Sequence, residues 1–242
     1  MTLLRSAVFN AWFFGLTTVF GVWGLGIRRF APRRALGVAQ VWARLVLGGL
    51  RRICAVQVVV TGREHLPASG PALIASQHQS AFDTLIWLEL VPSVSYVYKI
   101  ELQRVPLFGP LLVLAGQIGV DRAAGLSALR SLLRGAERAA AEGRQIVIFP
   151  EGTRTDPGES VPLQPGVAAI SARTRLPVIP VATDSGLRWR RRGFRKLRGP
   201  IHVAICAPLR PGLSNADLLT ELRASWDGAA LGVAAVADKA VS

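Results

Sequence analysis

The first strong pattern in the chain is an apolar run over residues 7–27 that contains no charged side chain. As a helix it would be roughly 31 Å long at about 1.5 Å per residue, so the run predicts a segment that enters or crosses a bilayer. A cleaved signal peptide is the alternative, but the run is long for one and no small-residue cleavage site follows before Arg28. The arginines favour a cytoplasmic position for the rest of the chain, because Arg5 precedes the run and four follow it: Arg28, Arg29, Arg33 and Arg34.

A second apolar run, over residues 35–50, has the pattern of an interfacial helix. Its polar interruptions, Gln40 and Arg44, lie on one narrow stripe of a helix. We therefore expect residues 1–52 to form a helical pair that anchors the protein to one leaflet. A helical hairpin packed on the following domain is the other interpretation.

From residue 53 onward, short β-branched runs alternate with helical ones. Leucine and alanine recur every three or four residues between Leu126 and Ala140, which predicts an amphipathic helix ending at Gly143. A last helix is expected over residues 215–226. This alternation is typical of an α/β domain with a mostly parallel sheet flanked by helices, so we expect one such domain over residues 53–242. The expected strands are residues 56–61, 72–76, 93–98, 117–120, 145–149, 178–182 and 202–206.

Composition adds a lipid and an anionic partner to this picture. The 242 residues suffice for one substantial domain and a short appendage. Half of them are apolar, and the mean hydropathy of +0.36 indicates that part of this material faces lipid. The net charge of +14 implies nucleic acid, acidic lipid or a phosphorylated substrate. Cys54 and Cys206 match no metal or redox spacing and are expected to be buried free thiols.

The first segment suited to chemistry is residues 77–83, at a turn between an expected strand and an expected helix. There the neutral imidazole of His78 could take a proton from a hydroxyl group, with Asp83 orienting it. Residues five apart on one helix diverge by about 140°, so the pair requires His78 to lie before the helix. Alternatively, Ser80 and Asp83 form a capping box, a role compatible with the first. His202 lacks acidic neighbours in sequence, and neither it nor His65 lies in a motif, so both are assigned structural roles.

The second segment, residues 149–155, follows another expected strand. Its turn exposes backbone N–H groups and carries Arg154, a combination suited to phosphate. The alternative is an ordinary turn with a surface ion pair between Glu151 and Arg154. Lys99 and Arg122 each end an expected strand and could converge on the same anion, although isolated charges are more often solvated.

In order along the chain, these segments resemble the PlsC family of 1-acyl-sn-glycerol-3-phosphate acyltransferases, within the glycerophosphate acyltransferase superfamily. Residues 78–83 are similar to its H-x4-D block, 99–109 to K-x-E-L-x3-P-x2-G, 149–154 to FPEGTR and 178–181 to V-I-P-V. The sequence departs from the pattern at Gln77, usually Asn, and at residues 81–82, which affects substrate preference rather than reaction type.

The resemblance implies the superfamily's α/β fold with an N-terminal two-helix membrane motif. It implies that His78, oriented by Asp83, deprotonates the sn-2 hydroxyl of 1-acylglycerol-3-phosphate. The hydroxyl then attacks the thioester of acyl-CoA or acyl-carrier protein and gives phosphatidic acid in phospholipid biosynthesis. No metal, cofactor or covalent acyl-enzyme is implied. The implied glycerophosphate site is Glu151, Gly152, Thr153 and Arg154, with positive charge from Lys99 and Arg122, and the V-I-P-V strand helps to wall the lipid channel.

A basic run over residues 188–198 holds seven basic side chains with Trp189 and Phe194 among them. Such a run could bind nucleic acid or press its aromatic side chains against an anionic bilayer, and the N-terminal helices favour the bilayer. The expected location is the cytoplasmic face of the inner or plasma membrane. Two alternative functions remain: an acyltransferase with another acceptor such as a lyso-ornithine lipid, and a non-catalytic membrane-binding module.

Overall fold

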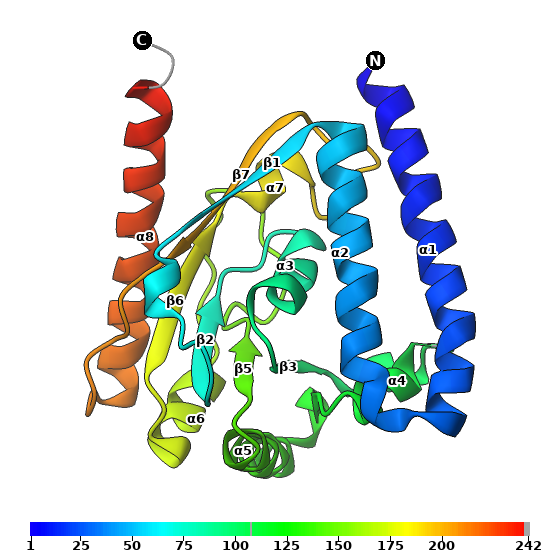
Figure 1. Cartoon of the computed structure of the whole chain (residues 1–242). Coiled ribbons are helices and arrows are strands. Elements are labelled where there is room, and N and C mark those ends of the chain that lie inside the picture. The colour runs from blue at the N-terminus through cyan, green and yellow to red at the C-terminus, as the bar shows by residue number, and fades with distance from the viewer. Residues whose placement is uncertain (107, 240–242) are drawn as a thin grey trace.

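The core of the protein is a seven-stranded sheet with the strand order β1-β7-β6-β2-β5-β3-β4 (Figure 1). The computed structural model describes residues 1–106 and 108–239. All neighbouring strands are parallel except the β6–β7 pair, which is antiparallel. All seven expected strands are present, with small shifts at their ends. Their bounds are β1 Val56–Thr61, β2 Ala72–Ser76, β3 Val94–Lys99, β4 Ile118–Val120, β5 Gln145–Ile148, β6 Val178–Thr183 and β7 Gly199–Ile205.

Helices cover both faces of the sheet and divide the core into two layers. On one face α3 packs with the N-terminal helices over the inner strands, and on the other lie α5, α6 and α8. The expected amphipathic helix is α5, whose apolar positions are buried against the sheet. The last helix, α8, continues well beyond the expected residue 226. The bounds are α3 Phe82–Leu90, α4 Gly109–Leu114, α5 Leu126–Ala141, α6 Gly166–Thr174, α7 Ser185–Arg188 and α8 Asn215–Lys239.

The two apolar runs at the N-terminus form α1, Thr2–Phe30, and α2, Ala35–Cys54, which lie side by side. The inner side of α2 belongs to the same apolar cluster as α3 and the sheet. Helix α1 contacts the α/β domain near both of its ends. Near its start Ser6 Oγ accepts a hydrogen bond from the Lys196 backbone N–H at 2.9 Å, and near its end Gly24 lies so close to Leu111 that a Cβ atom there would be 2.6 Å from Leu111 Cδ1. The pair is therefore a hairpin packed along the domain.

The outward side of α1 remains apolar and exposed. Within the described part of the chain, α1 is the single helix that is long and apolar enough to cross a membrane. Only 11% of its most apolar window is buried. The exposed side chains run along its whole length: Leu3, Leu4, Val8, Trp12, Phe14, Val19, Val22, Trp23, Leu25 and Phe30. Water is a poor solvent for such a continuous apolar surface, which is typical of a contact with lipid or another apolar partner.

Two smaller expectations have mixed outcomes. Cys54 is a buried free thiol as expected, whereas Cys206 is free but only half-buried. His202 has no acidic neighbour in the local sequence, but the fold gives it one. Its Nδ1 lies 2.7 Å from Asp184 Oδ2, and its backbone N–H donates to Asp184 Oδ1 at 2.7 Å. This carboxylate comes from the end of β6, 18 residues earlier, so the sequence around His202 gives no sign of it.

Candidate active site

The segments with polar motifs meet at one edge of the sheet. β2, β5, β3 and β4 are parallel neighbours, and each ends just before or at one of these segments. His78 follows β2, Phe149 follows β5, Lys99 ends β3 and Arg122 follows β4. Because the carboxyl ends of parallel strands lie at the same edge, the fold brings together residues that are far apart in sequence.

His78 and Asp83 form a pair at this edge. His78 Nδ1 lies 3.3 Å from Asp83 Oδ2. The imidazole is largely covered, with 13% of its side chain exposed, while the Asp83 side chain is 2% exposed. As expected from the spacing of five residues, His78 precedes the helix, because α3 starts only at Phe82. With Nδ1 facing the carboxylate, Nε2 is the ring nitrogen left to exchange a proton with another molecule.

The same carboxylate caps α3. Asp83 Oδ2 accepts hydrogen bonds from the backbone N–H groups of Gln79 and Ser80, both at 2.7 Å. Ser80 Oγ in turn accepts a hydrogen bond from the Phe82 N–H at 3.0 Å. The expected capping box is half formed, because Asp83 bonds the Ser80 N–H while Ser80 Oγ bonds Phe82 rather than Asp83. The same oxygen atom of Asp83 also faces the imidazole. This fixes the position of the carboxylate before any substrate arrives.

The segment after β5 holds the backbone of His78 on both sides. Glu151 Oε2 accepts a hydrogen bond from the His78 N–H at 2.6 Å, and the Thr155 N–H donates to the His78 carbonyl oxygen at 2.8 Å. Thr155 Oγ1 also donates to Glu151 Oε1 at 3.0 Å. The Phe149 ring stacks on the imidazole at a centroid distance of 4.1 Å. The histidine is thus fixed by backbone bonds and ring packing together.

Glu151 lies behind the histidine rather than beside the other turn residues. It is 4% exposed and its carboxylate is occupied by His78 and Thr155. The alternative of a surface ion pair between Glu151 and Arg154 is therefore wrong. Burial raises the pKa of the Glu151 carboxyl from 4.5 to about 7, although hydrogen bonds from His78 and Thr155 oppose the shift.

This shifted carboxyl gives a measurable dependence of stability on pH. A carboxyl whose pKa is higher in the folded state stabilises the fold at low pH, and its contribution is lost as pH rises from about 4.5 to 7. We expect the free energy of unfolding of the wild type to fall by about 2–3 kcal/mol more than that of Glu151→Gln between pH 4.5 and 8. Denaturant unfolding in detergent, followed by tryptophan fluorescence, measures the difference. Glu64→Gln, at an exposed position, is the control, and equal slopes for all three proteins would contradict the raised pKa.

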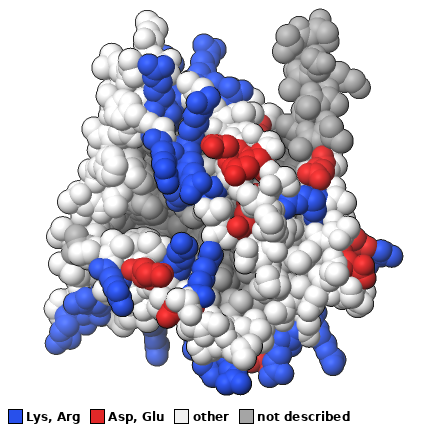
Figure 2. Space-filling view, turned by 180° about the vertical axis from the view of Figure 1, so that it is seen from behind, with Lys and Arg blue, Asp and Glu red and all other residues white. Residues whose placement is uncertain are grey.

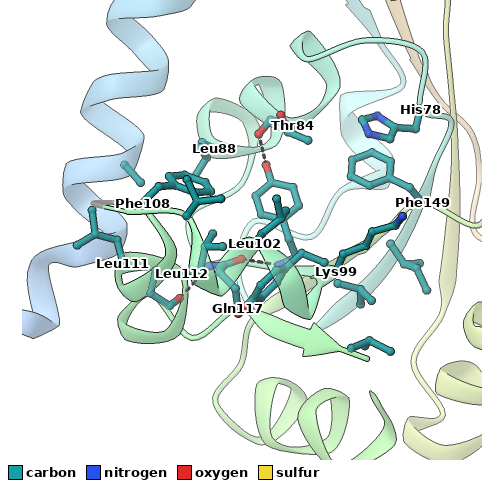
Figure 3. Close-up of a pocket in the computed structure, with 18 of the residues that line it drawn as sticks. His78, Thr84, Leu88, Lys99, Leu102, Phe108, Leu111, Leu112, Gln117 and Phe149 are labelled. Atoms are coloured by element: carbon teal, nitrogen blue, oxygen red, sulfur yellow. Dashed lines mark hydrogen bonds between the residues drawn. The ribbon is translucent and has the colours of Figure 1, made fainter. Parts of the chain in front are cut away.

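A cavity of about 960 Å³ opens beside His78. Figure 3 shows His78 and Phe149 at one end with Lys99 directed toward them, and Leu88, Leu102, Phe108, Leu111 and Leu112 around the other end, next to the N-terminal helices. The lining near His78 is cationic and includes Lys99, Arg122 and Arg154. A volume of this size, apolar at one end and charged at the other, suits an amphiphilic molecule with an anionic group.

The cationic end is organised around residues 152–154. Arg122 Nη1 donates a hydrogen bond to the Gly152 carbonyl oxygen at 2.5 Å. Arg154 is partly buried, and this burial lowers the pKa of its guanidinium while the nearby Asp83 carboxylate opposes the shift. Gly152 has φ +70° and a Cβ atom there would lie 3.1 Å from Arg122 Nη1, so glycine permits both the turn and the close approach of the arginine.

The structure gathers most of the candidate residues around one cavity and separates two of them. His78, Lys99, Arg122, Gly152, Thr153 and Arg154 line it, whereas Asp83 and Glu151 lie behind His78. The expectation that the V-I-P-V strand walls the channel is wrong, since residues 178–181 form β6 within the two apolar cores. No role was predicted from the sequence for the Phe149 ring. Its position as the first residue of the FPEGTR segment was the signal that could have indicated one.

Comparisons with known proteins agree with this arrangement. The family model described as "Acyltransferase" matches residues 57–184. The 1-acyl-sn-glycerol-3-phosphate acyltransferase of Pseudomonas aeruginosa is 32% identical over 204 residues, which covers 84% of this chain and 79% of that protein. The coconut (Cocos nucifera) protein of the same name is 33% identical over 57% of this chain and 46% of its own length. The human alpha form is 29% identical over 59% of this chain and 50% of its own length.

The fold as a whole is shared with a solved structure. The crystal structure of the 1-acyl-sn-glycerophosphate (LPA) acyltransferase PlsC from Thermotoga maritima superposes with a TM-score of 0.78 at 21% identity, over 97% of this chain and 98% of that chain. The alignments span only about half the length of the coconut and human relatives. Since the family model spans the residues that surround His78 and the Pseudomonas relative aligns over most of the sequence, this chain belongs to the acyltransferase family.

Proposed function

We propose that the protein transfers a fatty acyl group from a thioester to the sn-2 hydroxyl of 1-acylglycerol-3-phosphate, which gives phosphatidic acid and a free thiol. One observation carries the proposal. The His78–Asp83 pair stands at the cationic end of a deep apolar cavity, where a base, an anion site and space for a hydrocarbon chain coincide. The names of the relatives, which describe acylation of lysophosphatidic acid in bacteria, plants and mammals, support it.

The proposed reaction uses the free ring nitrogen of His78. Nε2 takes the proton of the acceptor hydroxyl as its oxygen forms a bond to the thioester carbonyl carbon. The tetrahedral intermediate then collapses, the carbon–sulfur bond breaks, and the imidazolium returns its proton to the leaving thiolate. Asp83 stabilises the transient imidazolium through Nδ1. Glu151, bonded to the His78 backbone, is a positioning residue in this scheme rather than a ligand of the acceptor.

The acceptor phosphate is proposed to bind at the cationic end of the cavity. In the acceptor, the carbon that bears the phosphate is adjacent to the carbon that bears the hydroxyl, so the phosphate must lie within a few ångströms of His78. Arg154, Lys99 and Arg122 line the cavity there, with the Gly152–Thr153 backbone between them. The hydrocarbon chain then lies among the leucines and phenylalanine at the apolar end.

Arg154 tests the phosphate assignment. We expect Arg154→Gln to raise the KM for lysophosphatidic acid by about tenfold or more, because a charge-assisted hydrogen bond contributes about 1.5–3 kcal/mol. The effect on kcat should be smaller, since the contact is made in the ground state as well as the transition state. Initial rates at varied acceptor concentration in mixed micelles measure both constants. Arg134→Gln, an exposed substitution on α5, should change neither constant, and an unchanged KM for Arg154→Gln would favour a neutral acceptor headgroup.

Residues 1–52 are proposed to form the membrane-facing part of the protein. The outward side of α1 offers lipid a continuous apolar strip, and its attachment near both ends favours a helix that lies along the domain within one leaflet. Arginines at the turn between α1 and α2 favour the cytoplasmic face of the cell membrane. This location would let the acceptor pass from the bilayer into the cavity without crossing water.

A screen of donors and acceptors with the purified protein in detergent tests the proposed function. We expect lysophosphatidic acid with an acyl thioester to give phosphatidic acid, identified by mass. Acyl-CoA and acyl-carrier protein are compared as donors, and a lyso-ornithine lipid is the alternative acceptor. Product from the lyso-ornithine lipid alone would reassign the substrate, and no transfer with any pair would favour a non-catalytic membrane module.

A further inference from the structure

We propose that residues 190–193, here called the arginine turn, bind the phosphate groups of the coenzyme A part of the acyl donor. The turn contains Arg190, Arg191, Arg192 and Gly193. The inference rests on the proposed function in taking an acyl thioester as donor. It assigns a second anion site, separate from that for the acceptor phosphate.

The arginine turn stands next to the mouth of the main cavity but outside it. A second hollow of about 360 Å³ is lined by Arg190, Arg191, Arg192, Gly193 and Asp156, none of which lines the main cavity. Arg191 Nη2 donates a hydrogen bond to Thr153 Oγ1 at 3.2 Å. Thr153 does line the main cavity, so this bond joins the two sites. Figure 2 shows that arginine and lysine side chains gather in clusters on one face of the molecule.

The loop that carries the arginine turn is fixed at its base. Trp189 is 7% exposed and packs edge-on against Phe9 and Phe13 of α1, with centroid distances of 5.3 and 5.9 Å. The expectation that this tryptophan faces a bilayer is therefore wrong, although Phe194 is 54% exposed. Trp189 also pairs with Lys196 through an isolated β-bridge, which closes the loop.

Lys196 strengthens this base from inside. It is 4% exposed, and burial lowers the pKa of its ammonium group. Its Nζ donates to Asn10 Oδ1 at 2.9 Å, to the Phe194 carbonyl oxygen at 3.0 Å and to the Gly193 carbonyl oxygen at 3.3 Å. A buried lysine with three acceptors holds the loop in one conformation, so its arginines are presented from a defined base rather than a freely moving loop.

The geometry of the two substrates decides which anion belongs at the arginine turn. The acceptor phosphate must bind inside the main cavity, because it is attached next to the carbon that bears the reacting hydroxyl. The phosphates of an acyl-CoA lie at the far end of the pantetheine arm, many bonds from the thioester carbon. A phosphate site outside the cavity, joined to its mouth through Thr153, therefore fits the donor and not the acceptor.

The size and the lining of the second hollow favour a nucleotide over a protein as its ligand. Small-molecule sites are typically about 300–1,000 Å³, and this hollow lies in that range. A protein partner such as an acyl-carrier protein would need about 800 Å² of matching surface on this side. Three arginine residues line this hollow, and the guanidinium group offers the forked donors that phosphate oxygens accept. We therefore assign the site to the diphosphate and 3′-phosphate groups of coenzyme A.

Direct binding tests the site without any reaction. Calorimetric titration of free coenzyme A into the full chain in detergent should give a Kd that Arg191→Gln weakens by about tenfold and that the matched Arg134→Gln leaves unchanged. The same titration with His78→Ala should give wild-type affinity. Binding therefore reports the donor site even if no acyl transfer is detected, so failure of the site and failure of the proposed function are distinguishable.

A series of shortened donors then locates the contact. Arg191→Gln should lower kcat/KM for acyl-CoA by about tenfold while leaving that for S-acyl pantetheine, which has no phosphate, at the wild-type value. The KM for lysophosphatidic acid should not change. The assignment is overturned by an equal loss with both donors, by a raised acceptor KM, by a loss confined to acyl-carrier protein, or by weaker flotation with acidic liposomes at unchanged donor kinetics.

Discussion

Replacing His78 with alanine should lower kcat by about 10²- to 10⁴-fold, the usual contribution of a general base. The loss should be chemical rather than structural. The bonds that hold this position, from its N–H to Glu151 and from Thr155 to its carbonyl oxygen, are backbone bonds that alanine keeps. Only the ring stacking on Phe149 and the contact with Asp83 disappear. Single-turnover rates with saturating substrates measure the effect.

The matched control is His65→Ala, which removes an imidazole that is not part of the cavity lining. It should retain wild-type rates. Flotation with acidic liposomes should be the same for both variants and the wild type, because the apolar strip on α1 is unchanged. A His78→Ala protein that keeps a near wild-type kcat would remove the histidine as the base.

Replacing Asp83 should lower kcat by a similar factor and should also lower the stability of the protein. We expect Asp83→Ala to lower kcat by about 10²- to 10⁴-fold, because the imidazole loses both its orientation and the charge that stabilises its protonated form. It should also lower the melting temperature, since the Gln79 and Ser80 N–H groups lose their acceptor. Rates are therefore compared well below the melting temperature.

Asp83→Asn separates the charge from the cap. The amide oxygen of asparagine can accept the same bonds from the Gln79 and Ser80 N–H groups. It carries no charge, so we expect kcat to fall by about tenfold or more, the difference between a charged and a neutral hydrogen bond. A wild-type kcat for Asp83→Asn would restrict Asp83 to its role as a helix cap.

The fold was predictable from the sequence where local pattern and burial agree. Residues 72–76 coincide with β2, whose five buried residues leave a continuous apolar signature. Residues 56–61 coincide with β1, an edge strand whose valines predict a strand although several of its positions are exposed. The antiparallel pairing of β6 and β7 and the extension of α8 past residue 226 carry no comparable local signal. The antiparallel pairing depends on how segments distant in sequence close the sheet.

For the site, the sequence identified the residue types but not the direction in which each side chain points. The spacing from His78 to Asp83 predicted a pair whose histidine precedes the helix, because helix geometry alone requires it. That Glu151 turns inward to the His78 backbone while Arg154 lines the cavity depends on the single turn between them. Likewise, the contact of Arg191 with Thr153 joins segments 38 residues apart and became visible only in three dimensions.

The attachment of α1 to the loop of the arginine turn makes that helix more than a detachable tether. Asn10 and Ser6 accept hydrogen bonds from Lys196, and Phe9 packs against Trp189. Deleting the first residues of the chain would therefore remove the contacts that fix the loop together with the exposed apolar surface. A water-soluble variant would therefore need polar substitutions at the outward positions of α1, with its inward residues left unchanged. One helix thus carries both the exposed apolar surface and the contacts that fix the loop of the arginine turn.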